Sequence, residues 1–321
     1  MMPRVAATTK RILPRWLTDP TGPLGPGAVI VRGEQLRVWG LSEVWRVHLG
    51  GPVPASVIVK RGAGEMAEEA RRYRDLVVPL GVAAPKLLAA AGGDDGAPAV
   101  LVLQDVGPDT LEQRPTADGY REAVRALARM RSVAARRLAD DPAIGGRLRR
   151  TTADFVDTAR RVGVGLTRVR PDLTGATDDP ARVLLERLSR PAGQPDTIVH
   201  GDFHAKNLVH GNAGGRIVAV DWPGAYVHPH LGDLYCLIRE ADQRGLTRDV
   251  ATATLPGVFA EAAGVEPARV ADQLVTGGLC WTLTALRWVV EEGLHAVPVS
   301  RDWIDGLVAE FRALAADRPG P

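Results

Sequence analysis

The chain has 321 residues, of which 45% are hydrophobic and 24% are charged, and its formal net charge at pH 7 is +2. This composition excludes a disordered or fibrous protein, and the small net charge gives no reason to expect nucleic acid as a partner. The longest apolar stretch, residues 274–290, contains Arg287 and is too short and interrupted for the ~18–20 residues of a membrane span.

The cysteines and the N-terminus bear on the compartment. Cys236 and Cys280 form neither a disulfide framework nor a metal-binding spacing. The first residues lack the continuous apolar core of a secretory signal. We therefore expect a cytoplasmic protein that has no membrane or nucleic-acid partner. No pattern in the sequence predicts an oligomeric state.

The first third of the chain has a β-type pattern after a lead-in rich in proline and glycine, residues 1–27. Glycines separate the expected strands, and Gly81 closes one expected helix. The strands are Ala28–Trp39, Ser42–Leu49, Ala55–Arg61, Pro85–Ala91 and Pro98–Val106, with a turn at 92–96, and the helix is Glu65–Leu80. Residues 28–106 are therefore expected to form a small β-rich domain.

Residues 107–321 have the apolar spacing of helices, apart from a short β region at Thr197–Asp221. The expected helices are Asp118–Leu138, Ala153–Leu166, Asp179–Leu188, Asp233–Gln243, Val250–Ala263, Pro267–Glu292 and Arg301–Ala316. The sequence thus predicts an α+β protein with a second, helical domain. Small ligands commonly bind in a cleft between two such domains.

The segment with the clearest chemistry is HGDFHAKN at 200–207, followed by IVAVDW at 217–222. The glycine-rich run between them predicts a β-hairpin. Folding that hairpin places Asn207 opposite residues 219–221, so that Asn207 and Asp221 lie on one side with Asp202 slightly upstream. Amide and carboxylate oxygens suit Mg²⁺, and a further carboxylate can accept a hydroxyl proton.

These paired motifs resemble the signature of the aminoglycoside phosphotransferase and choline kinase superfamily, relatives of the protein kinases. The resemblance implies a protein-kinase-like fold of two lobes, a small β-rich N-lobe and a larger helical C-lobe, with nucleotide in the cleft. It also implies that Asp202 is the catalytic base, Asp221 the principal Mg²⁺ ligand and Asn207 another. His200 resembles the histidine that braces the loop, and Asp233 resembles a second aspartate, which we interpret as a helix N-cap.

The resemblance extends to the first domain. VIVK at 57–60 resembles the strand whose lysine grips the nucleotide phosphates, and Lys60 is one of only four lysines among 40 basic residues. Alone, such a lysine is usually a solvated edge charge. Glu69 resembles the helix glutamate that pairs with this lysine, and Glu68 is the alternative.

Further nucleotide contacts follow from the same resemblance. The strand 100–106 resembles the strand and hinge that bind adenine, which implicates Gln104 and Val106. The nucleotide loop, residues 39–44, includes Ser42 and has one glycine in place of G-x-G-x-x-G. ATP is therefore expected as the cofactor, with GTP left open, together with Mg²⁺.

Two residues of the catalytic segment have two interpretations each. His204 is predicted to position the γ-phosphate or to pack the loop. Lys206 is predicted to lie near the transferring phosphate or to be a surface lysine. Both are included among the cofactor-binding predictions.

The acceptor site is predicted from charge. From Asp233 onward the chain has 13 acidic residues against 8 arginines, which would suit a cationic, hydroxylated small molecule. The candidate substrate residues are Glu240, Asp242, Trp281, Trp288, Glu291 and Glu292. The alternative is that the acids are solvated helix ends and the tryptophans belong to the core.

The sequence therefore predicts an ATP-dependent kinase that phosphorylates a hydroxyl of a small molecule. An antibiotic of the aminoglycoside type, in resistance or self-protection, is the first expectation, and a metabolite (choline, homoserine or a sugar) is the alternative. A metal-dependent hydrolase would need His200, Asp202 and His204 to converge on one ion. A non-catalytic binding module would be expected to lack the base, the lysine or the metal ligands.

Overall fold

The computed structural model of the chain describes residues 13–19, 22–25, 27–51, 56–93, 97–190, 193–211 and 216–317. Most of the expected lead-in, the tip of the turn at 92–96 and the centre of the expected hairpin loop lie outside these residues. The chain divides into two compact units, each described here by itself. The first consists of Met1–Ala70 and Lys86–Asp105, and the second of Arg71–Pro85 and Val106–Pro321.

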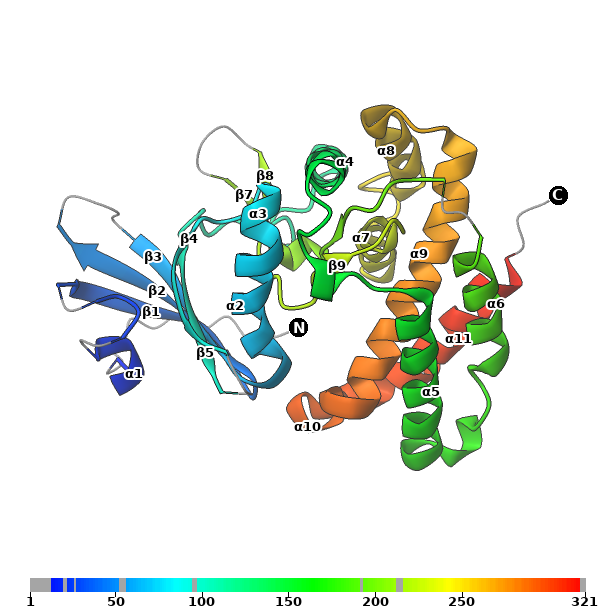
Figure 1. Ribbon diagram of the computed structural model, residues 1–321, viewed down its shortest axis with the longest axis horizontal. Coiled ribbons are helices and arrows are strands. Elements are labelled where there is room, and N and C mark those ends of the chain that lie inside the picture. Colours follow the sequence, from blue (N-terminus) through cyan, green and yellow to red (C-terminus); the bar gives the residue numbers. More distant parts are fainter. Residues whose placement is uncertain are drawn as a thin grey trace. The chain divides into compact units, whose positions relative to one another are not determined.

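The first unit contains a five-stranded antiparallel sheet in the order β1-β2-β3-β5-β4 (Figure 1). Its apolar cluster includes Trp45, Val57 and Val102, and Leu17 of the short helix α1 (Arg15–Thr18) contributes to it. All five expected strands are present, with ends moved by one or two residues. They are β1 Val29–Trp39, β2 Ser42–Gly50, β3 Ser56–Gly62, β4 Leu87–Gly92 and β5 Ala99–Gln104.

The helix expected at Glu65–Leu80 is present but is not uniformly α-helical. A 3₁₀ turn leads into α2 (Glu68–Arg72), a π-helical turn follows at Tyr73–Val77, and α3 (Val78–Leu80) completes it. Gly81 ends the helix in the left-handed region, with φ of 64°, which glycine adopts without a steric cost. The boundary between the two units falls inside α2.

The second unit is built around the long helix α9. This helix packs against α5, α6, α7, α8 and α11 (Figure 1). Its buried leucines belong to a large apolar cluster of this unit. The helices are α4 Ala117–Asp140, α5 Thr152–Val169, α6 Asp178–Leu188, α7 Gly232–Gln243, α8 Leu255–Ala263, α9 Pro267–Trp288, α10 Leu294–Ala296 and α11 Trp303–Ala316. Within the described residues, none is both long and apolar enough to cross a membrane.

A glycine in α9, Gly277, allows α7 to lie very close to α9. A β-carbon at Gly277 would lie 2.4 Å from the backbone nitrogen of Gly232, the first residue of α7. No side chain can be accommodated at that distance, so the start of α7 is held directly against α9. This contact places Asp233, the next residue along α7.

Several expected helix ends differ from the structure; α5, for example, runs three residues beyond the expected Leu166 to Val169. The helix expected from Val250 begins as α8 at Leu255 after a 3₁₀ turn, and the one expected from Arg301 begins as α11 at Trp303. The helix expected to reach Glu292 leaves α-geometry after Trp288 and continues as a π-helical turn, Val289–Gly293. Ends of this kind depend on local packing more than on apolar spacing.

Two short antiparallel pairs form the β region of the second unit. They are β6 (Ile198–Val199) with β9 (Tyr226–Val227), and β7 (Leu208–His210) with β8 (Ile217–Ala219). In the second pair Leu208 lies opposite Ala219, which is the register expected from the sequence.

Candidate active site

The β7–β8 hairpin brings the two chemical motifs together. The backbone N–H of Val220 donates to the carbonyl of Asn207 at 2.9 Å and so extends the hairpin by one pair. Asp221 follows directly, with φ of 70°. Few non-glycine residues adopt this left-handed conformation, and they concentrate at functional sites. Asn207 and Asp221 therefore start from the same end of the hairpin.

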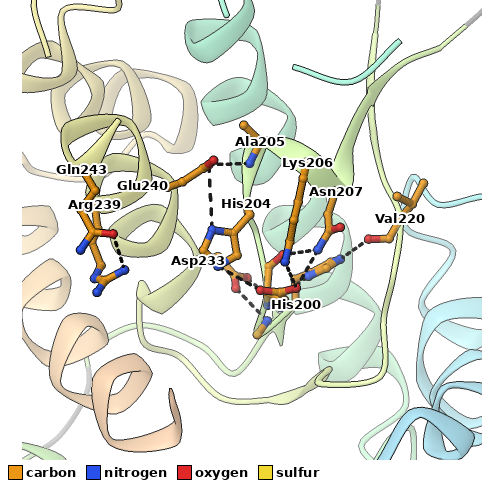
Figure 2. A network of polar contacts seen from close by, with 12 residues as sticks. His200, His204, Ala205, Lys206, Asn207, Val220, Asp233, Arg239, Glu240 and Gln243 are labelled. Carbon is orange, nitrogen blue, oxygen red and sulfur yellow. Dashed lines mark hydrogen bonds and ion pairs between the residues drawn. The ribbon is translucent and has the colours of Figure 1, made fainter. Parts of the chain in front are cut away.

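Three side chains hold the carboxylate of Asp202, and Figure 2 labels all three: His204, Lys206 and Asn207. Asn207 Nδ2 donates to Asp202 Oδ2 at 2.8 Å and to its backbone oxygen at 2.9 Å. His204 Nε2 lies 3.0 Å from Asp202 Oδ1, and Lys206 Nζ lies 3.4 Å from Oδ2. The Asp202 side chain is nevertheless 36% exposed, so the carboxylate is anchored on one side and accessible on the other.

The charges around Asp202 determine its ionisation. Burial by itself raises the pKa of Asp202, but the positive charges of His204 and Lys206 outweigh burial and hold the pKa well below the ordinary value. Burial by itself lowers the pKa of His204, whereas Cys236 and then the Asp202 carboxylate raise it well above the ordinary value. At neutral pH the site thus contains an aspartate anion flanked by two cations.

His200 lies beneath the loop and is fully buried. Its Nδ1 accepts the backbone N–H of Asp202 at 3.2 Å, and its Nε2 lies 3.1 Å from the carbonyl oxygen of Val220. Burial lowers its pKa, consistent with a neutral ring that carries its proton on Nε2. His200 therefore ties the backbone at Asp202 to the end of the hairpin.

Asp233 is not a helix N-cap, and that prediction is wrong. The helix starts one residue earlier, at Gly232, so Asp233 already lies in its first turn. Its buried carboxylate accepts the backbone N–H groups of His200 at 2.7 Å and of Gly201 at 2.9 Å. Asp233 therefore braces the start of the catalytic loop against α7.

The residues at the end of the hairpin fit a hard divalent cation. Because Asn207 Nδ2 donates to Asp202, the amide is oriented and its Oδ1 is the atom left for a metal. The carboxylate of Asp221 could supply a second oxygen, and Mg²⁺ prefers oxygen ligands of these two kinds.

The hydrolase alternative is not supported. No group of three histidine, cysteine, aspartate or glutamate side chains in the described part of the chain could hold a metal ion. In particular, both ring nitrogens of His200 already have partners in the backbone. His200, Asp202 and His204 therefore do not form a transition-metal site.

In the first unit, Lys60 and Glu69 form an ion pair whose side chains are only 7% and 0% exposed. Lys60 comes from β3 and Glu69 from α2, so Glu69 rather than Glu68 is the partner of the lysine. Ser42 is buried as the first residue of β2, and Gln104 is exposed as the last residue of β5. Val106 belongs to the second unit.

Of the six predicted substrate residues, Glu240 and Trp281 adjoin the catalytic loop. Glu240 Oε2 accepts the backbone N–H of Ala205 at 2.8 Å, and the Trp281 ring lies edge-on to His204, with centroids 6.0 Å apart. The sequence did not reveal Arg239, whose guanidinium covers Trp281 at 4.6 Å from the ring centroid. The only sequence feature that could have indicated Arg239 is its position next to Glu240, a predicted substrate residue.

The other predicted substrate residues have contacts within the fold. Asp242 accepts the hydroxyls of Thr247 and Thr252, and Trp288 stacks on Trp303. Glu291 accepts from Arg161 and Arg287, while Glu292 lies in the same π-helical turn as Glu291. A groove of about 830 Å³ along α5 and α6 contains none of the predicted site residues.

Comparisons with known proteins agree with this geometry. The model of the phosphotransferase enzyme family matches residues 38–271. No individual curated protein matches the sequence. Three similar solved structures, each below 25% identity, support the fold.

The first is a protein from Ralstonia eutropha JMP134 with a provisional assignment as an aminoglycoside phosphotransferase, at 15% identity, TM-score 0.62, and coverage of 91% of this chain and 94% of that one. A thermostable mutant of aminoglycoside phosphotransferase APH(4)-Ia, in complex with ADP and hygromycin B, has 12% identity, TM-score 0.55 and coverage of 91% and 96%. Amicoumacin kinase hAmiN, with AMP-PNP, Ca²⁺ and Ami, has 14% identity, TM-score 0.59 and coverage of 88% of both chains.

The family match spans most of the chain and includes Lys60, Glu69, Asp202, Asn207 and Asp221. The resemblance to small-molecule kinases and the α+β, kinase-like fold expected from the sequence are confirmed. The chain therefore belongs to the phosphotransferase enzyme family.

Proposed function

We propose that the protein transfers the γ-phosphoryl group of a nucleoside triphosphate to a hydroxyl group of a small molecule. The observation that carries this proposal is the anchored, ionised and partly exposed carboxylate of Asp202. A carboxylate held in this way can orient an acceptor hydroxyl and accept its proton as the general base.

The proposed transfer forms a bond between the acceptor oxygen and the γ-phosphorus and breaks the bond from that phosphorus to the β–γ bridging oxygen. The hydroxyl proton passes to Asp202. Because the transition state of phosphoryl transfer is loose, the proton leaves late, and a carboxylate of low pKa is a sufficient base. The ammonium of Lys206 is close enough to Asp202 to offset charge on the transferred group.

The proposed nucleotide contacts follow from the family of the chain. Lys60, held by Glu69, binds phosphate oxygens, and Ser42, Gln104 and Val106 contact the rest of the nucleotide. Asn207 and Asp221 hold Mg²⁺, which when bound neutralises phosphate charge. ATP is the proposed donor, with GTP as the alternative. The ADP and AMP-PNP bound by proteins of the same fold support a nucleotide in this role.

An antibiotic is the first proposal for the acceptor, because two proteins of this fold have solved structures in complex with hygromycin B or with Ami. A metabolite such as choline, homoserine or a sugar is the alternative. A cationic acceptor is less favoured than the sequence suggested. It would have to displace Arg244 from Glu240 or Arg239 from the face of Trp281.

A nucleotide-consumption screen tests the function. The purified protein, ATP or GTP, and Mg²⁺ are incubated with a panel of hydroxylated antibiotics and metabolites, paired as cationic and neutral compounds of similar size. We expect consumption that depends on one class of acceptor, a phosphate ester on that acceptor by mass spectrometry, and neither with Asp202→Asn. Nucleotide consumption that yields only free phosphate with every acceptor would contradict phosphoryl transfer.

A further inference from the structure

Both sides of the Ala205 peptide backbone are held by glutamates from outside the catalytic loop. The N–H of Ala205 donates to Glu240 Oε2 at 2.8 Å, as Figure 2 shows, and its carbonyl oxygen accepts the backbone N–H of Glu112 at 3.2 Å. Ala205 is fully buried, so neither polar group can turn to water instead.

Arg244 joins the two glutamates. One of its terminal nitrogens lies 2.9 Å from Glu112 Oε1 and 3.1 Å from Glu240 Oε1. Glu240 is the most buried of the three side chains, at 13% exposure, and lies in the last turn of α7. Glu112, Arg244 and Glu240 thus form a charged chain that ends on the Ala205 backbone. We call these three residues the Ala205 clamp.

The segment that contains Glu112 runs alongside the catalytic loop beyond Ala205. The N–H of Leu111 donates to the carbonyl of Leu208, and the N–H of His210 donates to the carbonyl of Asp109, each at 2.8 Å. The backbone of residues 109–112 therefore pairs with the catalytic loop from Ala205 to His210. The Ala205 clamp lies at the Ala205 end of this pairing.

The clamped residue lies between the groups that hold the catalytic carboxylate. Ala205 separates His204 from Lys206, and both contact Asp202, as does Asn207 two residues further on. A shift of the Ala205 peptide would move all three contacts together. Misplacement of about 1 Å in an active site can lower turnover by about 100-fold.

We propose that Glu240 is a positioning residue for phosphoryl transfer, which acts through Ala205 and is itself held by Arg244 and Glu112. The proposal rests on the proposed function of Asp202. It replaces the acceptor-binding role that the sequence suggested for Glu240. One oxygen of its carboxylate is bonded to Ala205 and lies 3.9 Å from His204 Nδ1, and the other is bonded to Arg244.

Kinetics of two substitutions separate positioning from acceptor binding. Glu240→Gln keeps an oxygen that can accept the Ala205 N–H, whereas Glu240→Ala leaves that N–H buried without an acceptor. We expect Glu240→Ala to lower kcat by about 10- to 100-fold with the KM for nucleotide and acceptor nearly unchanged, and Glu240→Gln to retain most of the turnover. Glu261→Ala removes an exposed helical glutamate on α8 and is the matched control.

Three outcomes would overturn the proposal. A raised acceptor KM with unchanged kcat in both Glu240 variants would make Glu240 an acceptor ligand. An equal loss of kcat in both would show that the charge, and not the bond to Ala205, is what matters. A loss that follows only the folded fraction, measured by thermal unfolding, would make the role structural.

Amide hydrogen exchange tests the clamp without any acceptor. We expect Glu240→Ala to speed exchange about fivefold or more in the peptide 203–208, as the loss of one hydrogen bond implies, with Glu240→Gln and Glu261→Ala close to wild type. Unchanged exchange in Glu240→Ala overturns the clamp. Faster local exchange in a protein that phosphorylates no acceptor would instead keep the clamp and reject the proposed function.

Discussion

The Lys60–Glu69 pair of the first unit and the Asp202 cluster of the second unit use the same chemistry in opposite surroundings. In the first, an ammonium and a carboxylate face each other with 7% and 0% of their side chains exposed. In the second, Asp202 and Lys206 are 36% and 40% exposed. The Lys60–Glu69 pair is thus closed to solvent, whereas the Asp202 cluster is open to solvent on one side.

This difference separates stability from turnover. Both charges of a closed pair are already removed from water, so removal of one partner takes away the charge that compensates the other. In an open cluster the solvent can compensate for a lost charge, but the exposed carboxylate is the group that reactants can reach. We therefore expect substitutions in the Lys60–Glu69 pair to lower the free energy of unfolding as well as nucleotide use, and substitutions at Asp202 to change mainly kcat.

The largest expected effect is on turnover. Asp202→Asn keeps the shape of the side chain but removes the base, so kcat should fall by roughly 10²–10⁴-fold while the thermal unfolding midpoint changes little. Steady-state kinetics with the acceptor found in the screen measure the change in kcat, and thermal unfolding measures the change in the midpoint. A variant that retains most of its turnover would remove Asp202 from the role of base.

The next effect is on stability. Glu69→Ala removes the carboxylate that faces the buried Lys60 ammonium, and we expect a loss of about 3–5 kcal/mol in the free energy of unfolding, measured in denaturant. The double variant Lys60→Met/Glu69→Leu replaces the pair by apolar groups and should recover most of that loss without recovering nucleotide use. A single variant within about 0.5 kcal/mol of wild type, the range of ordinary surface substitutions, would contradict a closed pair.

A third prediction extends the comparison to a histidine kept neutral by its surroundings. Burial, followed by the charges of Arg131 and Arg150, lowers the pKa of His228 to about 4. The unfolded chain, with a pKa near 6.5, binds a proton that the folded chain does not. The free energy of unfolding should therefore fall as the pH drops from about 6.5 to about 4, by up to roughly 3 kcal/mol.

Denaturation in urea across this pH range measures the effect, and His228→Gln should flatten part of the slope. A remaining slope is expected because burial also holds the pKa of His230 well below the ordinary value. An unchanged slope in His228→Gln would exclude His228 as its source.

The smallest expected effect concerns salt. Since Glu240, Asp242 and Glu291 already have partners, raised ionic strength should change the acceptor KM by less than about twofold. The measurement is acceptor KM at low and high salt for a cationic and a neutral acceptor of similar size. A KM that rises steeply with salt for the cationic compound alone would restore the cationic-acceptor hypothesis.

Much of the fold could be predicted because its signals are local. The strands of the first unit and the β7–β8 hairpin follow from alternation and glycine breaks over a few residues. The hairpin alone was enough to bring Asn207 and Asp221 to one end. Helix ends were less predictable, since the starts at Leu255 and Trp303 depend on 3₁₀ turns that apolar spacing does not encode.

The sequence by itself determined which groups are available for the chemistry, through one contiguous motif and one hairpin. The tertiary structure decided which partner each charged side chain has. Asp233 bonds to His200 and Gly201 rather than to its own helix, and Glu291 bonds to Arg161, which is 130 residues away in the chain. Spacing along a chain sets only near neighbours, whereas these contacts depend on how α7 and α5 pack against α9.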